Sequence, residues 1–311
     1  MAVKNPFRGL GVALVTPFSQ DGSIDFTALG KVIDHQIEGG VDFLCVLGTT
    51  AETACLSIIE REAVKNFAIA RIAKRVPILL GCGGNNTSEV VRQLREDDFT
   101  GIDGILSVCP YYNKPSQEGI YQHFKAIAQA TSLPVVLYNV PGRTSVNMSA
   151  NTTLRLAHDF ENVVAIKEAS GDIQQVLDIM VDKPEDFDVL SGDDGISFEL
   201  IVMGAQGVVS VLGNALPKEL GAMVHLSLAG NINAALPLHR AMSHMCKLMF
   251  VDGNPAGVKT LMAQLGLLDN VLRLPLLPAT EATSKAIEKA LATLHQTFNT
   301  SMVKHQAKLC E

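Results

Sequence analysis

Eight short apolar runs recur through the first two thirds of the chain, and segments with helical periodicity separate them. Short runs rich in valine, isoleucine and leucine are typical of parallel strands that are buried on both faces. They predict strands at residues 11–15, 43–47, 77–80, 104–108, 134–138, from 163, at 188–190 and at 207–211. Helices are predicted between them, including one that begins after Ser57, because Ser57 and Glu60 have capping-box spacing.

Eight strands alternating with helices favour an α/β fold, the closed (β/α)8 TIM barrel. The alternative, a doubly wound open sheet, usually carries a glycine-rich nucleotide turn after an early strand, and the glycines at 81–84 match it weakly. Beyond about residue 216 only helical patterns remain, at 217–229, 233–250, 256–265 and 282–298. We expect a barrel with the active site over residues 1–225 and a C-terminal helical region over 226–311.

Composition narrows the range of partners. The formal net charge of −7 and the absence of a basic run interleaved with aromatics argue against nucleic acid. The first residues lack a signal-like apolar segment, and no apolar stretch approaches the length of a membrane span. We therefore expect a cytoplasmic protein with no membrane partner.

The cysteines and histidines give no metal-ligand spacing, because none of them forms a close Cys or His pair. Reduced, structural thiols and no metal site are expected. The reactivity of Cys109, near the predicted mouth of the barrel, stays open. The six cysteines are Cys45, Cys55, Cys82, Cys109, Cys246 and Cys310.

The sixth predicted strand carries Lys167 at its carboxyl end. An ammonium group in apolar surroundings tends to lose its proton, and the free amine is a nucleophile toward carbonyls. Lys167 is therefore a candidate Schiff-base lysine. The alternative is a lysine that reaches solvent or pairs with Glu168.

In a TIM barrel the loops after the strands converge on one mouth, which brings further candidates toward Lys167. Tyr138 ends the fifth strand and could carry protons, although a buried core tyrosine is the alternative. Thr49 and Thr50 offer backbone amides and hydroxyls for a carboxylate or a proton relay, or form an ordinary cap. Arg143 follows Pro-Gly and could grip a carboxylate, or be solvated.

Tyr111 and Tyr112 lie on a long strand-helix loop, where two exposed aromatics predict a subunit contact.

Several motifs occur in order along nearly the whole chain and together resemble the dihydrodipicolinate synthase family, also called the 4-hydroxy-tetrahydrodipicolinate synthases. The similarity extends into the C-terminal region at Asn254-Pro255, Val258-Lys259 and residues 272–275. The combination with Arg143 is specific, since N-acetylneuraminate lyases keep the tyrosine and the lysine but not this arginine. The motifs are Thr16-Pro17-Phe18, Gly48-Thr49-Thr50-x-Glu52, Pro110-Tyr111-Tyr112-Asn113-Lys114-Pro115, Tyr138-Asn139-Val140-Pro141-Gly142-Arg143-Thr144, Ile166-Lys167-Glu168-Ala169-Ser170 and Ser191-Gly192-Asp193-Asp194.

The resemblance implies a lyase, a carbon–oxygen lyase by classification, of diaminopimelate and lysine biosynthesis. Lys167 would form an imine with pyruvate without an external cofactor, and the derived enamine would attack L-aspartate 4-semialdehyde. Tyr138 would pass protons through Thr50 to Tyr112 of a neighbouring subunit. The implied assembly is a homotetramer, a dimer of dimers, with a dimer left open.

Five positions receive binding or orienting roles from the resemblance. The amides of Thr49 and Thr50 would hold the pyruvate carboxylate, and Arg143 would hold that of the semialdehyde. The carbonyls of Gly192 and Val209 would lie against Lys167 and orient it.

Two departures from the family pattern stand out. Ala51 replaces the usual glycine, and if that position needs a positive φ the alanine costs about 1 kcal/mol. Asn85, Glu89 and Tyr111 match the site where sensitive members bind L-lysine as a feedback inhibitor. Ile58 and Arg61 replace its usual histidine or acid, so we expect weak or absent inhibition.

Two other functions stay open. A related Schiff-base lyase or aldolase would act on a sugar acid with the same lysine. A barrel that binds a keto acid without catalysis is also possible, since a fold alone does not imply activity.

Overall fold

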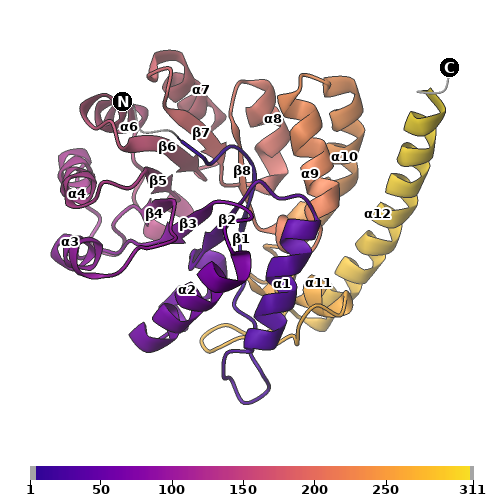
Figure 1. Ribbon diagram of the computed structural model, residues 1–311. Coiled ribbons are helices and arrows are strands. Elements are labelled where there is room, and N and C mark those ends of the chain that lie inside the picture. Colours follow the sequence, from indigo (N-terminus) through magenta and orange to yellow (C-terminus); the bar gives the residue numbers. More distant parts are fainter. Residues whose placement is uncertain (1–4, 309–311) are drawn as a thin grey trace.

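The computed structural model describes residues 5–308, except for the side chains of residues 295–297 and 299–308. Its eight parallel strands form a closed barrel in which β8 pairs back onto β1 (Figure 1). The predicted (β/α)8 barrel is therefore confirmed. The strands are β1 (Gly9–Ala13), β2 (Phe43–Val46), β3 (Ile78–Gly81), β4 (Gly104–Val108), β5 (Val135–Asn139), β6 (Val163–Glu168), β7 (Asp188–Ser191) and β8 (Gly207–Ser210).

The first strand begins earlier than its apolar run predicts, at Gly9 rather than at residue 11. Gly9 has no side chain and escapes a search for apolar residues, yet its backbone pairs with Gly207 of β8. Gly11 is needed for packing, because a Cβ there would come 2.1 Å from the ring of Phe43. Phe43 belongs to the packed interior of the barrel, and its ring packs edge-on against that of Phe7.

Helices surround the barrel, and a larger apolar layer lies between them and the strands. The capping box predicted for α2 is confirmed, since the Ser57 hydroxyl accepts from the Glu60 N–H and the Glu60 carboxylate accepts from the Ser57 N–H. These helices are α1 (Phe26–Glu38), α2 (Ile58–Ile72), α3 (Thr87–Glu96), α4 (Gln117–Ala130), α5 (Pro141–Thr144), α6 (Ala150–Asp159), α7 (Ile173–Asp182), α8 (Ser197–Val202) and α9 (Pro217–Leu228).

Three more helices follow, namely α10 (Ile232–Leu248), α11 (Ala256–Gln264) and α12 (Glu281–Lys308). They gather beside α9 on one side of the barrel (Figure 1), where α12 packs on α10 and α11. α12 continues beyond the predicted end at residue 298, because its sequence contains no glycine or proline to stop it. The predicted boundary after residue 225 falls inside α9, and the division into two parts stays a prediction.

The described cysteines are all free, and Cys310 lies outside the described residues. In the same part of the chain, none of the helices has the length and apolar character needed to cross a membrane.

Candidate active site

Lys167 points into the barrel from the carboxyl end of β6. Side chains two apart on a strand share a face, and Ala165 belongs to the packed interior of the barrel. Lys167 is therefore aimed inward, and it is 5% exposed. Its neighbours in the barrel register are Tyr138 of β5 and Leu190 of β7.

The amine of Lys167 lies over the ring of Tyr138, 4.4 Å from the ring centroid. Within residues 5–308 no carboxylate forms an ion pair with it. A cation–π contact offsets only part of the cost of burying a charge, so this amine is held in an apolar environment without a counter-ion. The expected chemistry of a nucleophilic lysine fits this environment.

Glu168 does not pair with Lys167, so the alternative in which the lysine pairs with this carboxylate is wrong. Successive side chains on a strand point to opposite faces, and Glu168 therefore points out of the barrel. Its carboxylate accepts hydrogen bonds from the Asn139 and Gln175 side-chain amides and from the Ser170 N–H. Burial raises the pKa of Glu168, and these donors oppose the rise.

Gly192 lies directly against Lys167. A Cβ at Gly192 would stand 3.1 Å from Cε of Lys167 and 2.6 Å from Cβ of Ala169, so a side chain there would displace the lysine. Val209 is fully buried on β8 and belongs to the same interior cluster as Tyr138 and Leu190.

The threonine loop after β2 is a tight 3-10 turn, η1 (Thr49–Ala51). Thr49 is exposed, whereas Thr50 is buried and its hydroxyl accepts a 3.0 Å hydrogen bond from Nδ2 of Asn254. The positive φ belongs to Glu52 (55°) and not to Ala51. The concern that Ala51 strains this turn therefore does not apply.

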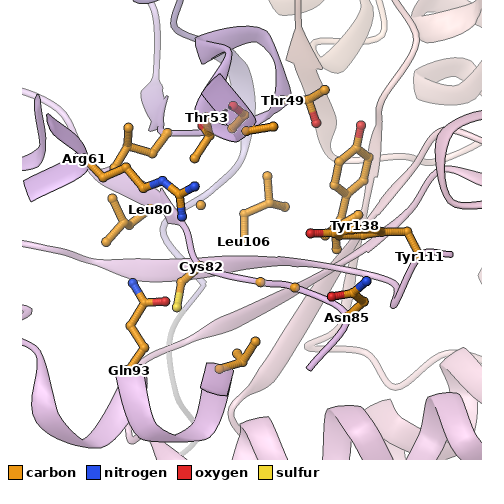
Figure 2. Close-up of a pocket in the computed structure, with 18 of the residues that line it drawn as sticks. Thr49, Thr53, Arg61, Leu80, Cys82, Asn85, Gln93, Leu106, Tyr111 and Tyr138 are labelled. Carbon is orange, nitrogen blue, oxygen red and sulfur yellow. Dashed lines mark hydrogen bonds between the residues drawn. The ribbon is translucent and has the colours of Figure 1, made fainter. Parts of the chain in front are cut away.

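A cavity of about 790 Å³ opens beside this loop. Thr49, Tyr138, Tyr111 and Arg143 line it, and Lys167 adjoins it through the ring of Tyr138. Figure 2 shows Tyr138 and Tyr111 at one end of the cavity and Arg61 at the other. The structure thus brings three of the predicted site residues, Thr49, Tyr138 and Arg143, to one cavity.

Arg143 lies in α5, directly after the Pro-Gly pair, and its side chain is exposed. No ion pair to it is found within the described residues. Its guanidinium is therefore available to a carboxylate that enters the cavity.

Tyr112 does not line the cavity in the single chain. It is 85% exposed and its φ is 75°, in the left-handed region that a tyrosine rarely adopts. Tyr111 beside it is 42% exposed and does line the cavity. A role for Tyr112 therefore depends on a second subunit, and the subunit contact stays a prediction.

The proposed lysine-site residues line the outer part of the cavity. Both carboxylate oxygens of Glu89 are held by Arg92, at 2.6 and 3.1 Å. Arg61 extends into the cavity wall, and its Nε donates to the Leu56 carbonyl at 3.1 Å. The Glu89 carboxylate is therefore already paired, and the Arg61 guanidinium lies in the same lining, where an amino-acid cation would enter.

Cys109 is fully buried, and burial raises the pKa of its thiol well above the ordinary range. A thiol that is buried and has a raised pKa forms little thiolate, so we expect Cys109 to be structural. Among residues 5–308, no group of three histidine, cysteine or acidic side chains is arranged to hold a metal.

Sequence reasoning missed the support that the C-terminal region gives to the threonine loop. Asn254 lines the cavity and bonds Thr50, and Lys259 of α11 forms a fully buried ion pair with Glu52. One signal was present, namely a lysine within the apolar helix that begins at Ala256. Nothing in the sequence points to its partner.

A TIM barrel with a buried, unpaired lysine at the carboxyl end of a strand, beside a tyrosine, defines the class of Schiff-base lyases that use a class I aldolase mechanism. Comparison with known proteins identifies the family within this class. The model of the Dihydrodipicolinate synthetase family matches residues 6–294, and the chain belongs to this family. The sequence assignment to carbon–oxygen lyases is wrong in its subclass, although the enzyme is a lyase.

The chain is 55% identical to a 4-hydroxy-tetrahydrodipicolinate synthase of Phocaeicola vulgatus over 294 residues, which cover 94% of this chain and 98% of the relative. The solved synthase of Methylacidiphilum fumariolicum matches with a TM-score of 0.92 at 37% identity, covering 95% of this chain and 98% of its own. A solved monomeric dihydrodipicolinate synthase variant matches with a TM-score of 0.90 at 38% identity, covering 93% and 97%.

Proposed function

We propose that the protein catalyses the 4-hydroxy-tetrahydrodipicolinate synthase reaction, the condensation of pyruvate with L-aspartate 4-semialdehyde in lysine biosynthesis. The observation that carries the proposal is the amine of Lys167, buried over Tyr138 without a carboxylate partner in the described chain. The relatives that share this family over almost their whole length support the choice of reaction.

In the first half of the reaction, the Lys167 amine attacks the carbonyl carbon of pyruvate and water leaves, giving an imine. A proton then leaves the methyl carbon and the electron pair forms an enamine. The enamine carbon attacks the aldehyde carbon of the semialdehyde, whose oxygen takes up a proton. The substrate amine finally attacks the imine carbon, closes the ring and releases Lys167. No external cofactor takes part in these steps.

Hydroxyl groups at the mouth of the barrel are assigned the proton transfers. Tyr138 lies near the carboxyl end of β5 and is paired in register with Lys167, and Thr50 lies in the loop after β2. We assign Tyr138 the first proton transfer and Thr50 the next. Tyr112 of a neighbouring subunit would complete the relay, in keeping with its high exposure in the single chain.

The remaining site residues bind and orient. The N–H groups of Thr49 and Thr50 at the start of η1 suit the pyruvate carboxylate, and Arg143 suits that of the semialdehyde. The carbonyls of Gly192 and Val209 are assigned the orientation of Lys167; the close approach of Gly192 to Cε supports the first of these.

The test is borohydride reduction in the presence of pyruvate, followed by intact mass, peptide mapping and an assay with the semialdehyde. One pyruvyl adduct on Lys167 together with semialdehyde-dependent product is expected. An adduct without that product would indicate a related aldolase acting on a sugar acid. No adduct would indicate, at most, a keto-acid-binding barrel.

Arg143→Ala separates the two substrates. This variant should form the imine with pyruvate as the unchanged protein does, while kcat/KM for the semialdehyde falls by about 100-fold because a charge-assisted carboxylate contact is lost. Equal loss of imine formation and turnover would contradict the assignment of Arg143.

The proposed assembly is a homotetramer built from two tight dimers. Two surfaces support it: the exposed tyrosine loop, and an apolar stripe on α7 at Ile173, Leu177 and Val181. A dimer is the alternative outcome, and sedimentation analysis distinguishes the two. The cytoplasmic location stays a prediction.

We further propose that L-lysine inhibits this enzyme weakly or not at all. Glu89 is already paired with Arg92, which also binds Glu96, and Arg61 adds a positive charge to the same part of the cavity. Both features disfavour a cationic ligand. Titration of the activity with L-lysine checks this, and half-inhibition well below about 1 mM, which corresponds to about −4 kcal/mol of binding, would contradict it.

A further inference from the structure

Asn254 is the residue of the C-terminal region that touches the predicted proton relay. It lies between α10 and α11 and is 7% exposed. Its Nδ2 donates to the hydroxyl of Thr50 at 3.0 Å, across 204 positions of sequence. Its Oδ1 is buried and has no hydrogen-bond partner in the described chain, so the amide is anchored mainly through its donor.

A clamp of charged residues holds the two segments together. Lys259 of α11 pairs with one carboxylate oxygen of Glu52, and the backbone N–H of Arg273 donates to the other at 3.0 Å. Glu52 follows the threonine loop directly. The C-terminal region therefore binds both carboxylate oxygens of Glu52. The same region carries Asn254, so the Glu52 contacts help to hold Asn254 at hydrogen-bonding distance from Thr50.

The direction of the hydrogen bond determines where the Thr50 proton points. A hydroxyl group has one proton to donate and two lone pairs to accept with. Because Asn254 supplies a proton, Thr50 must direct its own proton elsewhere, and within residues 5–308 it donates to no acceptor. A hydroxyl that accepts a hydrogen bond is also polarised into a better donor.

We propose that Asn254 is a positioning residue that turns the Thr50 proton toward the reacting groups. This inference rests on the proposed function. Asn254 itself neither gains nor loses a proton; it fixes the direction in which Thr50 donates. The C-terminal region would then contribute directly to the proton steps that follow imine formation.

The test replaces Asn254 by Asp, which has the same shape but only accepts at about pH 8, where a carboxyl group is ionised. Thr50 would then donate to residue 254 instead of to the site. The readout is the exchange of pyruvate methyl protons for deuterium in D2O without semialdehyde. We expect Asn254→Asp to slow exchange at least about tenfold, with kcat reduced similarly, while borohydride still traps the adduct on Lys167.

Asn270→Asp is the matched control. Asn270 belongs to the same region, and its Nδ2 donates to the Thr260 hydroxyl at 3.1 Å, away from the cavity. Its exchange rate should equal that of the unchanged protein. Equal exchange rates in Asn254→Asp and the unchanged protein would overturn the inference, as would equal slowing in both variants.

A purely structural effect is separated by a double-variant cycle with Thr50→Val. If Asn254 acts through the hydroxyl, Asn254→Asp causes no further slowing once that hydroxyl is gone. A full additional loss would overturn the inference. If Asn254→Asp does not fold, Asn254→Ala is measured with the same two outcomes. Failure of the unchanged protein to form adduct or product would instead refute the proposed function.

Discussion

Two lysine amines are buried over aromatic rings in this molecule, and they differ in what else surrounds them. Lys167 lies 4.4 Å from the ring centroid of Tyr138 at the mouth of the barrel. Lys259 lies 4.2 Å from that of Phe18, between the barrel and the C-terminal helices. Lys259 also binds the Glu52 carboxylate and a backbone carbonyl, whereas Lys167 has no carboxylate partner in residues 5–308.

The difference separates a lysine held in a structural ion pair from the lysine that we propose to be the nucleophile. A partner carboxylate stabilises the ammonium form and removes its nucleophilic lone pair. Burial is the largest cause that lowers the pKa of Lys259 to about 8, even though the Glu52 carboxylate opposes the shift. An aromatic ring accompanies both amines, so the ring does not distinguish them; the carboxylate does. The same substitution, lysine to methionine, can therefore be compared at both positions.

The largest effect is expected from Lys167→Met. Loss of the nucleophile should reduce turnover by about 10⁴-fold or more and abolish the borohydride-trapped adduct. The free energy of unfolding should stay unchanged or rise, because methionine keeps the volume and removes an amine without a counter-ion. An adduct that moved to Lys259 in this variant would break the comparison.

Lys259→Met should lose stability and keep adduct formation, the opposite of Lys167→Met. It leaves the buried Glu52 carboxylate without its partner, which costs about 3–5 kcal/mol of stability in urea unfolding. The adduct on Lys167 should still form at temperatures where the protein is folded. Adding Glu52→Gln to Lys259→Met should restore part of the stability. Unchanged stability in Lys259→Met would show that the ion pair is dispensable.

The smallest expected effect is the pH dependence of stability that comes from Glu60, which binds Arg273 beside the clamp. The Arg273 guanidinium, followed by the Ser57 N–H, lowers the pKa of Glu60 to about 2. As the pH falls from about 4.5 toward 2, the unfolded chain binds a proton that the folded protein does not, so stability is lost in this window. Both side chains keep some exposure, which limits the loss to about 1 kcal/mol.

Glu60→Gln checks this prediction. Urea unfolding at several acidic pH values should give a shallower decline for Glu60→Gln than for the unchanged protein. Glu118→Gln, which removes an exposed partner of Arg155, is the control and should leave the decline nearly unchanged. Identical declines in all three proteins would contradict the assignment.

The barrel and the position of Lys167 were predictable, because each rests on a local pattern. An apolar run marks each strand, and a barrel gathers the strand ends whatever the loops contain. The alternative that Glu168 pairs with Lys167 rested on adjacency in sequence, but alternation along β6 separates the two side chains.

The clamp could not be predicted in the same way. Lys259 and Glu52 lie 207 positions apart, and no periodicity relates a helix after the barrel to a turn near its second strand. Asn254 could not be predicted either, because the role of its amide depends on its contact with the Thr50 hydroxyl. Contacts that join the C-terminal region to the loops depend on the packing of the whole chain.

The Glu52 contacts also set an order of events during protein synthesis. The threonine loop emerges from the ribosome early, but its partners Asn254, Lys259 and Arg273 follow 204 to 221 positions later. A nascent chain that has completed all eight strands still lacks them. The loop therefore acquires its final support only after the barrel sequence has been translated, and a chain cut short after β8 would carry Lys167 without a finished site around it.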